Sequence, residues 1–214
     1  MSEPQCPTSD RLAELLAAAG EPPLSGDQLQ LFSSYCSLII RWSARMNLTA
    51  VRTEEGVLSR HFVESIACAR ALPPGIATLL DFGSGAGFPG IPIAICRPEI
   101  AVTLAESHGK KAAFLQEAVR TLDLSVTVHA GRGEELRAVF DCVALRAVDQ
   151  MEEAVAAAAD MVSWKGLLAL MTTEAEFPRL SEAAGPDFSW LDPIPTPGGK
   201  DRLLALGMLN QVAS

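Results

Sequence analysis

The sequence lacks the features that mark several other classes of protein. Its five cysteines lie at least 28 residues apart, their number is odd and none forms a Cys-x-x-Cys pair, which argues against a zinc site or a disulfide framework. No run approaches the roughly 18 apolar residues that a membrane helix needs, and the first residues lack the basic and apolar regions of a secretory signal. We therefore expect a cytoplasmic protein with no metal and no membrane partner.

Positive charge is also scarce. Seventeen Lys and Arg residues stand against 26 Asp and Glu residues, which gives a formal net charge of −9. Such a protein repels polyanions as a whole, so any contact with RNA has to be a local basic patch. With 49% hydrophobic residues, the chain otherwise has the composition of an ordinary globular protein. Its 214 residues are enough for one large domain, or for one domain with an appendage. We expect a monomer.

The chain falls into two parts. Up to residue 75, apolar residues recur at spacings of three and four, which predicts three helices that begin near Ser9, Ser25 and Thr53. From residue 76, short apolar runs alternate with helical stretches, a pattern typical of a mainly parallel sheet with helices on both faces. We therefore expect a helical extension, 1–75, and one compact α/β domain, 76–214. The expected strands are 77–82, 101–105, 126–129, 142–145, 167–171 and 203–206, and the expected helices of this domain are 90–96, 110–122, 134–138 and 151–162.

The C-terminal part departs from this alternation. Three prolines and two glycines separate the short run 188–191 from the last expected strand. Because proline and glycine interrupt regular structure, we expect a closing antiparallel hairpin here. With it, the sheet would have seven strands.

The most informative run is LLDFGSGAGFPG, residues 79–90, in which an apolar strand ends in Asp81 and four glycines lead into a helix. Glycine lets the backbone turn sharply and approach a ligand, and the helix N-terminus offers free N–H groups. Residues 85–90 also match the dinucleotide pattern GxGxxG, which is weak by itself. A tight turn without any ligand is the alternative interpretation.

Two cofactors compete for this loop. A dinucleotide would bring a pyrophosphate close to Asp81, whereas the ammonium group of S-adenosylmethionine would be attracted to that carboxylate, directly or through water. Glu106, at the end of the next expected strand, would bind ribose hydroxyls of either cofactor. Glu134, with the amides of Gly133 and Glu134, would approach the adenine, unless it is an ordinary acid at a helix N-terminus.

Basic residues supply the remaining candidates. Arg146 ends the strand 142–145 and would point into the same crevice, where it needs an acceptor, either a ligand or Asp141 or Asp149. A locally basic stretch lies between residues 41 and 61; it is either a solvated helix face or a surface that holds phosphates. The expected RNA-binding residues are Arg41, Arg45, Arg52, Arg60 and His61, with Lys110, Lys111, Lys200 and Arg202 at the rim.

Several motifs, taken in order, resemble one family. They read NLTAVR at 47–52, HFVES at 61–65, DFGSGAGFPGIP at 81–92, ESHGKK at 106–111 and Arg-Ala at 146–147. Together they resemble the bacterial small-subunit ribosomal RNA guanine-N7 methyltransferase G family, also known as glucose-inhibited division protein B, from about residue 20 onward. The resemblance implies a class I S-adenosylmethionine-dependent methyltransferase fold, Rossmann-like, with an N-terminal helical extension. It also implies methyl transfer to N7 of one guanine in 16S ribosomal RNA, free or in the small ribosomal subunit.

The resemblance also assigns residues by position. Arg202 matches a basic position before the family's last strand, Glu64 and Glu106 stand where the family has aspartates, and Met171 stands where it usually has a lysine. By position, the resemblance gives the cofactor-binding residues Gly83, Phe88, Gly133, Glu134 and Arg146, with Glu106 at the ribose. The glycine loop and the acid before it add Asp81, Gly85 and Gly87 to the expected cofactor-binding residues.

Guanine N7 carries a lone pair and no proton, so direct in-line attack on the methyl group needs no general base. This fits a sequence in which no Ser/His/Asp or Cys/His arrangement stands out. We expect Arg146 to orient the base or the methionine carboxylate. An NAD(P)-dependent oxidoreductase that uses the GxGxxG loop and a non-catalytic ribosome-assembly or RNA-binding module remain alternatives.

Overall fold

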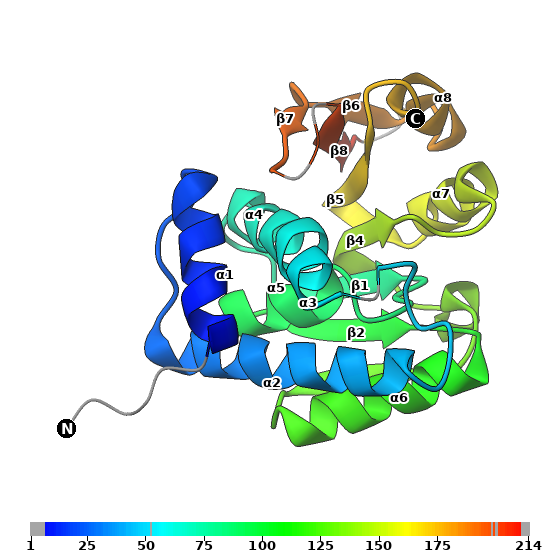
Figure 1. Ribbon diagram of the computed structural model, residues 1–214. Coiled ribbons are helices and arrows are strands. Elements are labelled where there is room, and N and C mark those ends of the chain that lie inside the picture. Colours follow the sequence, from blue (N-terminus) through cyan, green and yellow to red (C-terminus); the bar gives the residue numbers. More distant parts are fainter. Residues whose placement is uncertain (1–6, 52, 198, 200, 211–214) are drawn as a thin grey trace.

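The computed structural model describes residues 7–51, 53–197, 199 and 201–210 (Figure 1). The chain begins with α1 (Pro7–Ala18) and α2 (Gly26–Ser43), and a capping box of Ser25 and Gln28 starts α2. A third helical segment consists of α3 (Glu54–Gly56), the π-helical turn η1 (Val57–Phe62) and α4 (Val63–Ala71). The three expected helices are confirmed, and the π-helical turn is an addition.

The strands of the described chain form a single sheet. They run in the order β3-β2-β1-β4-β5-β8-β6, and β7 also pairs with β8. The first five are parallel, and β8 is antiparallel to β5 and β6. The strands are β1 (Thr78–Phe82), β2 (Ala101–Ala105), β3 (Val126–His129), β4 (Phe140–Arg146), β5 (Val162–Thr173), β6 (Phe188–Trp190), β7 (Ile194–Pro195) and β8 (Arg202–Leu209).

Two details correct the sequence interpretation. The closing antiparallel hairpin is confirmed, but the sheet has eight strands instead of seven. The additional strand, β7, is only two residues long and contains a proline, so it leaves no alternating pattern in the sequence. The expected helix 134–138 is a single 3₁₀ turn, η2 (Gly133–Leu136), followed by Arg137 in the left-handed region.

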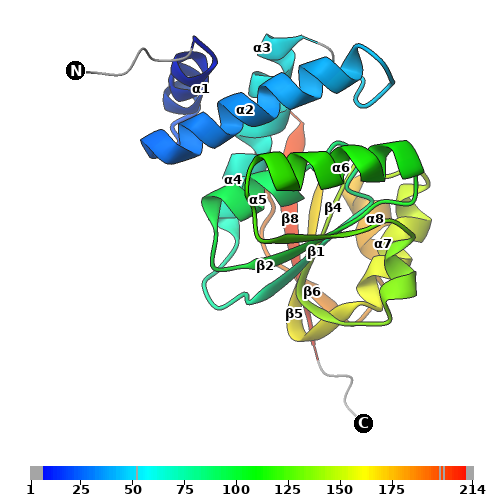
Figure 2. The same ribbon diagram turned by 90° about the horizontal axis from the view of Figure 1, so that it is seen from below.

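Helices cover both faces of the sheet. Alternate strand residues face opposite sides, so that Leu167 and Ala169 belong to one core and Leu168 and Leu170 to the other. α5 (Gly90–Cys96) and α6 (Gly109–Thr121) cover the first face, and α7 (Met151–Ala159) and α8 (Phe177–Ala183) cover the second. Beyond α5 and α6, α2 lies across the outside (Figure 2). The N-terminal helices and the sheet therefore share one hydrophobic core.

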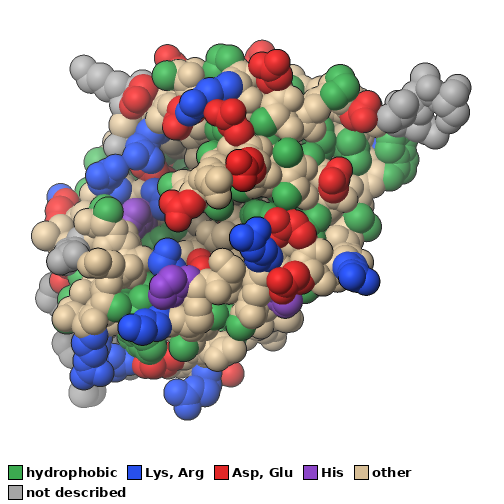
Figure 3. Space-filling model, turned by 90° about the vertical axis from the view of Figure 1, so that its right-hand side faces the viewer, with side chains coloured by type: hydrophobic (Ala, Val, Ile, Leu, Met, Phe, Trp, Pro, Cys, Tyr) green, Lys and Arg blue, Asp and Glu red, His purple; other side chains and the backbone are tan. Residues whose placement is uncertain are grey.

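The carboxyl ends of the parallel strands meet at one edge of the sheet. Phe82 pairs with Ala105, Ala105 pairs with His129, and Arg146 pairs with Met171. This edge lies on the right in Figure 1 and faces the viewer in Figure 3. Loops that leave such an edge line the ligand crevice of open α/β sheets. No helix among the described residues is long and apolar enough to cross a membrane.

Candidate functional site

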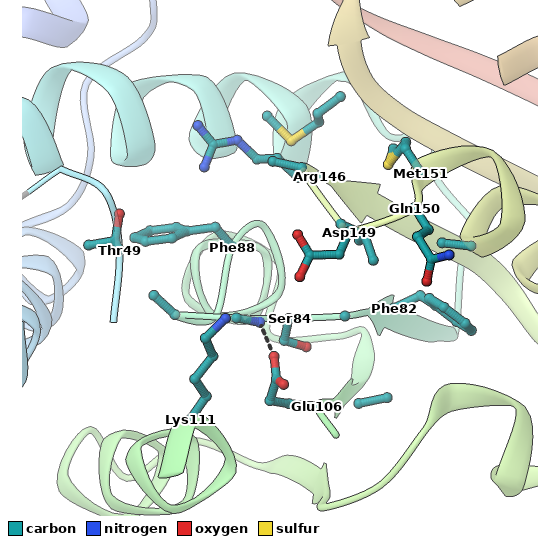
Figure 4. A pocket seen from close by; sticks show the side chains of 18 of the residues that line it. Thr49, Phe82, Ser84, Phe88, Glu106, Lys111, Arg146, Asp149, Gln150 and Met151 are labelled. Carbon is teal, nitrogen blue, oxygen red and sulfur yellow. Dashed lines mark hydrogen bonds between the residues drawn. The ribbon is translucent and has the colours of Figure 1, made fainter. Parts of the chain in front are cut away.

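A cavity of about 720 Å³ opens at this edge. Its walls come from the segment before and within η1, from the loops after β1, β2, β3 and β4, and from the ends of β5 and β8. It brings together residues that are far apart in the sequence (Figure 4). The expected residues that line it are Arg60, His61, Gly83, Gly85, Phe88, Glu106, Lys111, Gly133, Glu134, Arg146 and Arg202.

The loop after β1 depends on its glycines. Gly83, Gly85 and Gly87 have φ values of 75°, 58° and 89°, a region that other residues rarely adopt. A Cβ atom on Gly83 would lie 2.9 Å from Val148, and one on Gly87 would lie 2.7 Å from the Tyr35 hydroxyl. Gly83 and Gly85 line the cavity, whereas Gly87 packs beneath it and offers it no surface.

Glu106 fixes this loop. Its side chain is almost buried, with 7% exposed. One carboxylate oxygen accepts a hydrogen bond from the Gly85 N–H at 2.8 Å (Figure 4), and the other accepts from the His108 N–H at 2.7 Å. Each oxygen retains a lone pair, so the geometry leaves room for the expected bonds to ribose hydroxyls.

Asp81 does not line the cavity. It is fully buried, and its Oδ2 accepts a hydrogen bond from the Gly90 N–H at 2.9 Å, at the start of α5. Burial raises the pKa of this carboxyl to about 7. The direct contact with a ligand that the sequence suggested is therefore corrected, because an acid at the end of this buried strand meets the free N–H groups of the following helix. A link through water stays a prediction.

Arg146 is held by an unexpected partner. Its Nη2 lies 2.6 Å from Glu64 Oε2 and donates to the Arg60 carbonyl at 2.9 Å, while the guanidinium lies 5.8 Å from the centre of the Phe88 ring. The salt bridge considered to Asp141 or Asp149 is absent among the described residues. Asp141 instead accepts hydrogen bonds from the Ala77 and Thr78 amides, at the other end of the sheet.

Glu64 lies between two arginines. Its side chain is 1% exposed, and its Oε2 is also 3.4 Å from Arg202 Nη1. In the sequence, Glu64 stands out only as part of a family motif. Its position three residues after His61, one helical turn away, is the signal that places both on one helix face. Desolvation lowers the pKa of Arg146, and the Glu64 carboxylate opposes that shift.

His61 is a neutral member of this cluster. Burial, with Arg146 and Arg60 nearby, lowers its pKa to about 3. Because Arg146 donates to His61 Nδ1 at 2.9 Å, the ring proton lies on Nε2, which faces Thr49 Oγ1 at 2.9 Å. In this structure the neutral imidazole contacts Arg146, and the expected role of His61 in holding phosphates stays a prediction.

Tyr35 was not anticipated as part of the site. Its hydroxyl donates to the Ala86 carbonyl in the glycine loop, and its ring stacks on Phe62 with centroids 5.3 Å apart. Helix α2 of the N-terminal extension thus contacts the glycine loop directly. The only hint in the sequence is that this is the single tyrosine of the chain and lies on the apolar face of α2.

The expected basic residues separate into two groups. Arg60, Lys111 and Arg202 line the cavity at the sheet edge. A second cavity of about 590 Å³, which Trp42, Met46 and Glu117 also line, contains Arg41, Arg45 and Lys110. In Figure 3, Lys and Arg gather mainly in the lower part, where α2 and α6 lie, whereas most Asp and Glu lie higher. Arg52 and Lys200 lie outside the described residues.

Comparison with known proteins identifies the family. The family model described as rRNA small subunit methyltransferase G, GidB, matches residues 28–184. The chain belongs to this family. The expected family and the class I methyltransferase fold are thereby confirmed.

Within the part of the chain that the structure describes, no group of three or more His, Cys, Asp or Glu side chains is arranged to hold a metal ion.

Individual relatives agree with this assignment. A protein named ribosomal RNA small subunit methyltransferase G from Roseiflexus sp. is 44% identical over 131 residues, 58% of this chain and 56% of the relative. A protein of the same name from Xanthomonas euvesicatoria is 37% identical over 77% of this chain and 78% of the relative. The match thus spans little more than half the length of some relatives.

A solved structure supports the fold. The 16S rRNA N2 G1207 methyltransferase RsmC of Thermus thermophilus, in complex with AdoMet and guanosine, superposes with a TM-score of 0.55 at 18% identity. The match covers 72% of this chain and 40% of that one.

Proposed function

We propose that the protein transfers a methyl group from S-adenosylmethionine to N7 of a guanine in 16S ribosomal RNA, in the cytoplasm. The observation that carries this proposal is the cavity in which the glycine loop, Glu106 and Arg146 converge. Membership of the rRNA small subunit methyltransferase G family supports the reaction class and the RNA substrate.

The residues present fit S-adenosylmethionine. The cavity volume lies within the usual range for cofactor sites, about 300–1,000 Å³. Gly83 and Gly85 bring bare backbone to the surface of the cavity, and Glu106 faces it. Gly133 also lines the cavity and packs on the Phe82 ring, where a Cβ would lie only 2.5 Å from the ring. When bound, the cofactor supplies a methyl group activated by its positive sulfur. In this proposal Glu106 binds the ribose, and Gly133 and Glu134 border the adenine.

Arg146 has the positioning role at the reacting end. Three partners, Glu64, His61 and the Arg60 carbonyl, fix its guanidinium, while its Nε has no hydrogen-bond partner among the described residues and remains a donor. The guanidinium therefore orients the base or the methionine carboxylate from a rigid position. Because N7 carries no proton, the chain needs to supply no general base, and catalysis rests on proximity and alignment.

RNA binding has to overcome a net charge of −9. We propose a basic path from Arg60, Lys111 and Arg202 at the cavity to Arg41, Arg45 and Lys110 in the second cavity. The neighbouring residues Lys110 and Lys111 connect the two. Arg52 and Lys200 remain candidates from the sequence alone.

The proposal is tested by incubating the protein with S-adenosylmethionine and either unmodified 16S RNA or small subunits, followed by mass spectrometry of the nucleosides. We expect 7-methylguanosine in at least one of the two substrates and none without S-adenosylmethionine. RNA binding without transfer would favour the assembly module instead. Calorimetric binding of NAD, with none of S-adenosylhomocysteine, would favour the oxidoreductase.

A further inference from the structure

Two carboxylates in the cavity, Glu134 and Asp149, make no hydrogen bond or ion pair with any described residue. Five acids line the cavity, and three are engaged: both oxygens of Glu106 accept backbone hydrogen bonds, Glu153 accepts from Gln150, and Glu176 accepts from two threonines. Glu134 follows β3, at the adenine end of the proposed cofactor site. Asp149 makes no hydrogen bond or ion pair with any described residue.

The backbone holds Asp149 in a defined place. It lies in the short loop between β4 and α7, where Ala147 and Gln150 have positive φ values of 51° and 52°. Such conformations are strained for residues other than glycine and persist only where the surroundings impose them. Val148 packs on Gly83, since a Cβ there would lie 2.9 Å from its Cγ2, so this loop is locked against the glycine loop.

The side chain points toward the reacting end of the cavity. In Figure 4 the Asp149 carboxylate extends into the space that Phe88, Arg146 and Ser84 surround. On the other side of this space, Arg146 and Arg202 share one carboxylate, Glu64, so this wall carries an excess of positive charge. Asp149 is the carboxylate without a described partner that lies opposite that wall.

The chemistry of guanine matches this arrangement. Its N1–H and N2–H₂ groups are adjacent donors that the two oxygens of one carboxylate accept together, whereas adenine presents an acceptor at N1. Methylation at N7 leaves a positive charge on the guanine ring. A carboxylate at the N1/N2 edge therefore binds the ring more strongly as that charge develops, which lowers the barrier.

We propose that Asp149 recognises the N1–H and N2–H₂ edge of the target guanine and stabilises the charge that methylation creates. The inference rests on the proposed function, and it adds the residue that selects guanine.

The test uses two RNA fragments that contain the methylated position, one with guanosine and one with inosine, which lacks the N2 amine. For the wild-type protein we expect kcat/KM to be about 10- to 100-fold higher on guanosine, as for a hydrogen bond to a charged acceptor. Asp149→Asn should lower transfer to guanosine by about 100-fold. It should also reduce the ratio of kcat/KM on guanosine to kcat/KM on inosine to about 1, because the side-chain NH₂ of asparagine and the N2 amine are both donors.

The matched control is Asp192→Asn, an exposed aspartate outside the cavity, which should leave rate and ratio unchanged. If Asp149→Asn retains the wild-type ratio, the inference is overturned; weaker calorimetric binding of S-adenosylhomocysteine in that variant would then assign Asp149 to the cofactor. A wild-type protein that methylates neither fragment and also fails on 16S RNA and on small subunits would overturn the proposed function as well, so the two failures are distinguishable.

Discussion

Two arginine–glutamate pairs in this protein differ in their surroundings. Arg146 and Glu64 are buried beside the cavity, with 9% and 1% of their side chains exposed, whereas Arg41 and Glu117 on α2 and α6 are 57% and 28% exposed. A buried pair is costly to break because it leaves an uncompensated charge, whereas an exposed pair contributes little and exchanges partners freely. The first is suited to fixing geometry, and the second to binding phosphates.

The largest effect is expected from Glu64→Gln. Removing this charge leaves Arg146 and Arg202 facing each other in the cavity wall, and we expect the free energy of unfolding to fall by about 3 kcal/mol or more. Urea denaturation measures it. The matched control, Glu117→Gln, should change stability by less than about 1 kcal/mol. Equal losses in both variants would remove the distinction between the two pairs.

A double-mutant cycle sharpens this distinction. Arg146→Gln alone should destabilise the protein about as much as Glu64→Gln, because it leaves the carboxylate insufficiently paired. The double variant should recover part of that loss of stability, giving a coupling energy of about 1–3 kcal/mol. Its rate of methyl transfer should remain at least about 100-fold below that of the wild-type protein. Simple additivity of the two stability losses would contradict the pairing seen here.

The basic residues of the second cavity, Arg41, Arg45 and Lys110, should affect RNA binding and leave folding unchanged. In the triple variant Arg41→Ala, Arg45→Ala, Lys110→Ala, we expect RNA affinity to fall by about 10-fold or more. If each residue contacts one phosphate of single-stranded RNA, the slope of log affinity against log salt should decrease by about 2. Filter binding over a range of salt concentrations tests this. An unaltered slope would exclude these residues from the RNA path.

His61 makes the stability of the buried cluster depend on pH. Its pKa is about 3 in the folded protein against 6.5 in the unfolded chain, so the unfolded chain binds more protons between these values. The contribution of His61 to the free energy of unfolding is therefore fully present above pH 6.5. Below that pH it is lost by on the order of 1 kcal/mol for each pH unit. Relative to His61→Asn, wild-type protein should lose stability from pH 6.5 to 4.5. A stability difference between the two proteins that stays constant over this pH range would show that His61 has the same pKa in the folded and unfolded states.

The smallest effect concerns the glycine loop. Tyr35→Phe removes the hydrogen bond to the Ala86 carbonyl and should cost about 1 kcal/mol of stability, since the ring stacking is retained. Calorimetry should show several-fold weaker binding of S-adenosylhomocysteine. Unchanged binding would mean that the N-terminal extension does not support the cofactor loop.

The sequence was sufficient for features that depend on local pattern. Alternating apolar runs indicated the order of strands and helices, and the glycines at 83, 85 and 87 indicated the loop because only a few residues tolerate positive φ. Motif order then supplied the family. These signals arise within short stretches of chain, where spacing determines structure.

Features that depend on tertiary contacts were missed. Arg146 pairs with Glu64 across 82 residues of sequence, while the nearby Asp149, which seemed a natural partner, pairs with none of the described residues. Asp81 looked like a ligand because it ends a strand, yet the helix that follows takes up its carboxylate. In each case several partners were compatible with the sequence, and only packing selected one.

The central claim, methylation of guanine N7 in the cavity at the sheet edge, has one direct test. 16S RNA or small subunits treated with the protein and S-adenosylmethionine are reduced with borohydride and exposed to aniline, which cuts the strand at 7-methylguanosine. The account predicts one new cut at a guanine with wild-type protein and at least about 100-fold less cutting with Arg146→Gln. An uncut RNA that nevertheless carries the methyl group on another atom or base would contradict it.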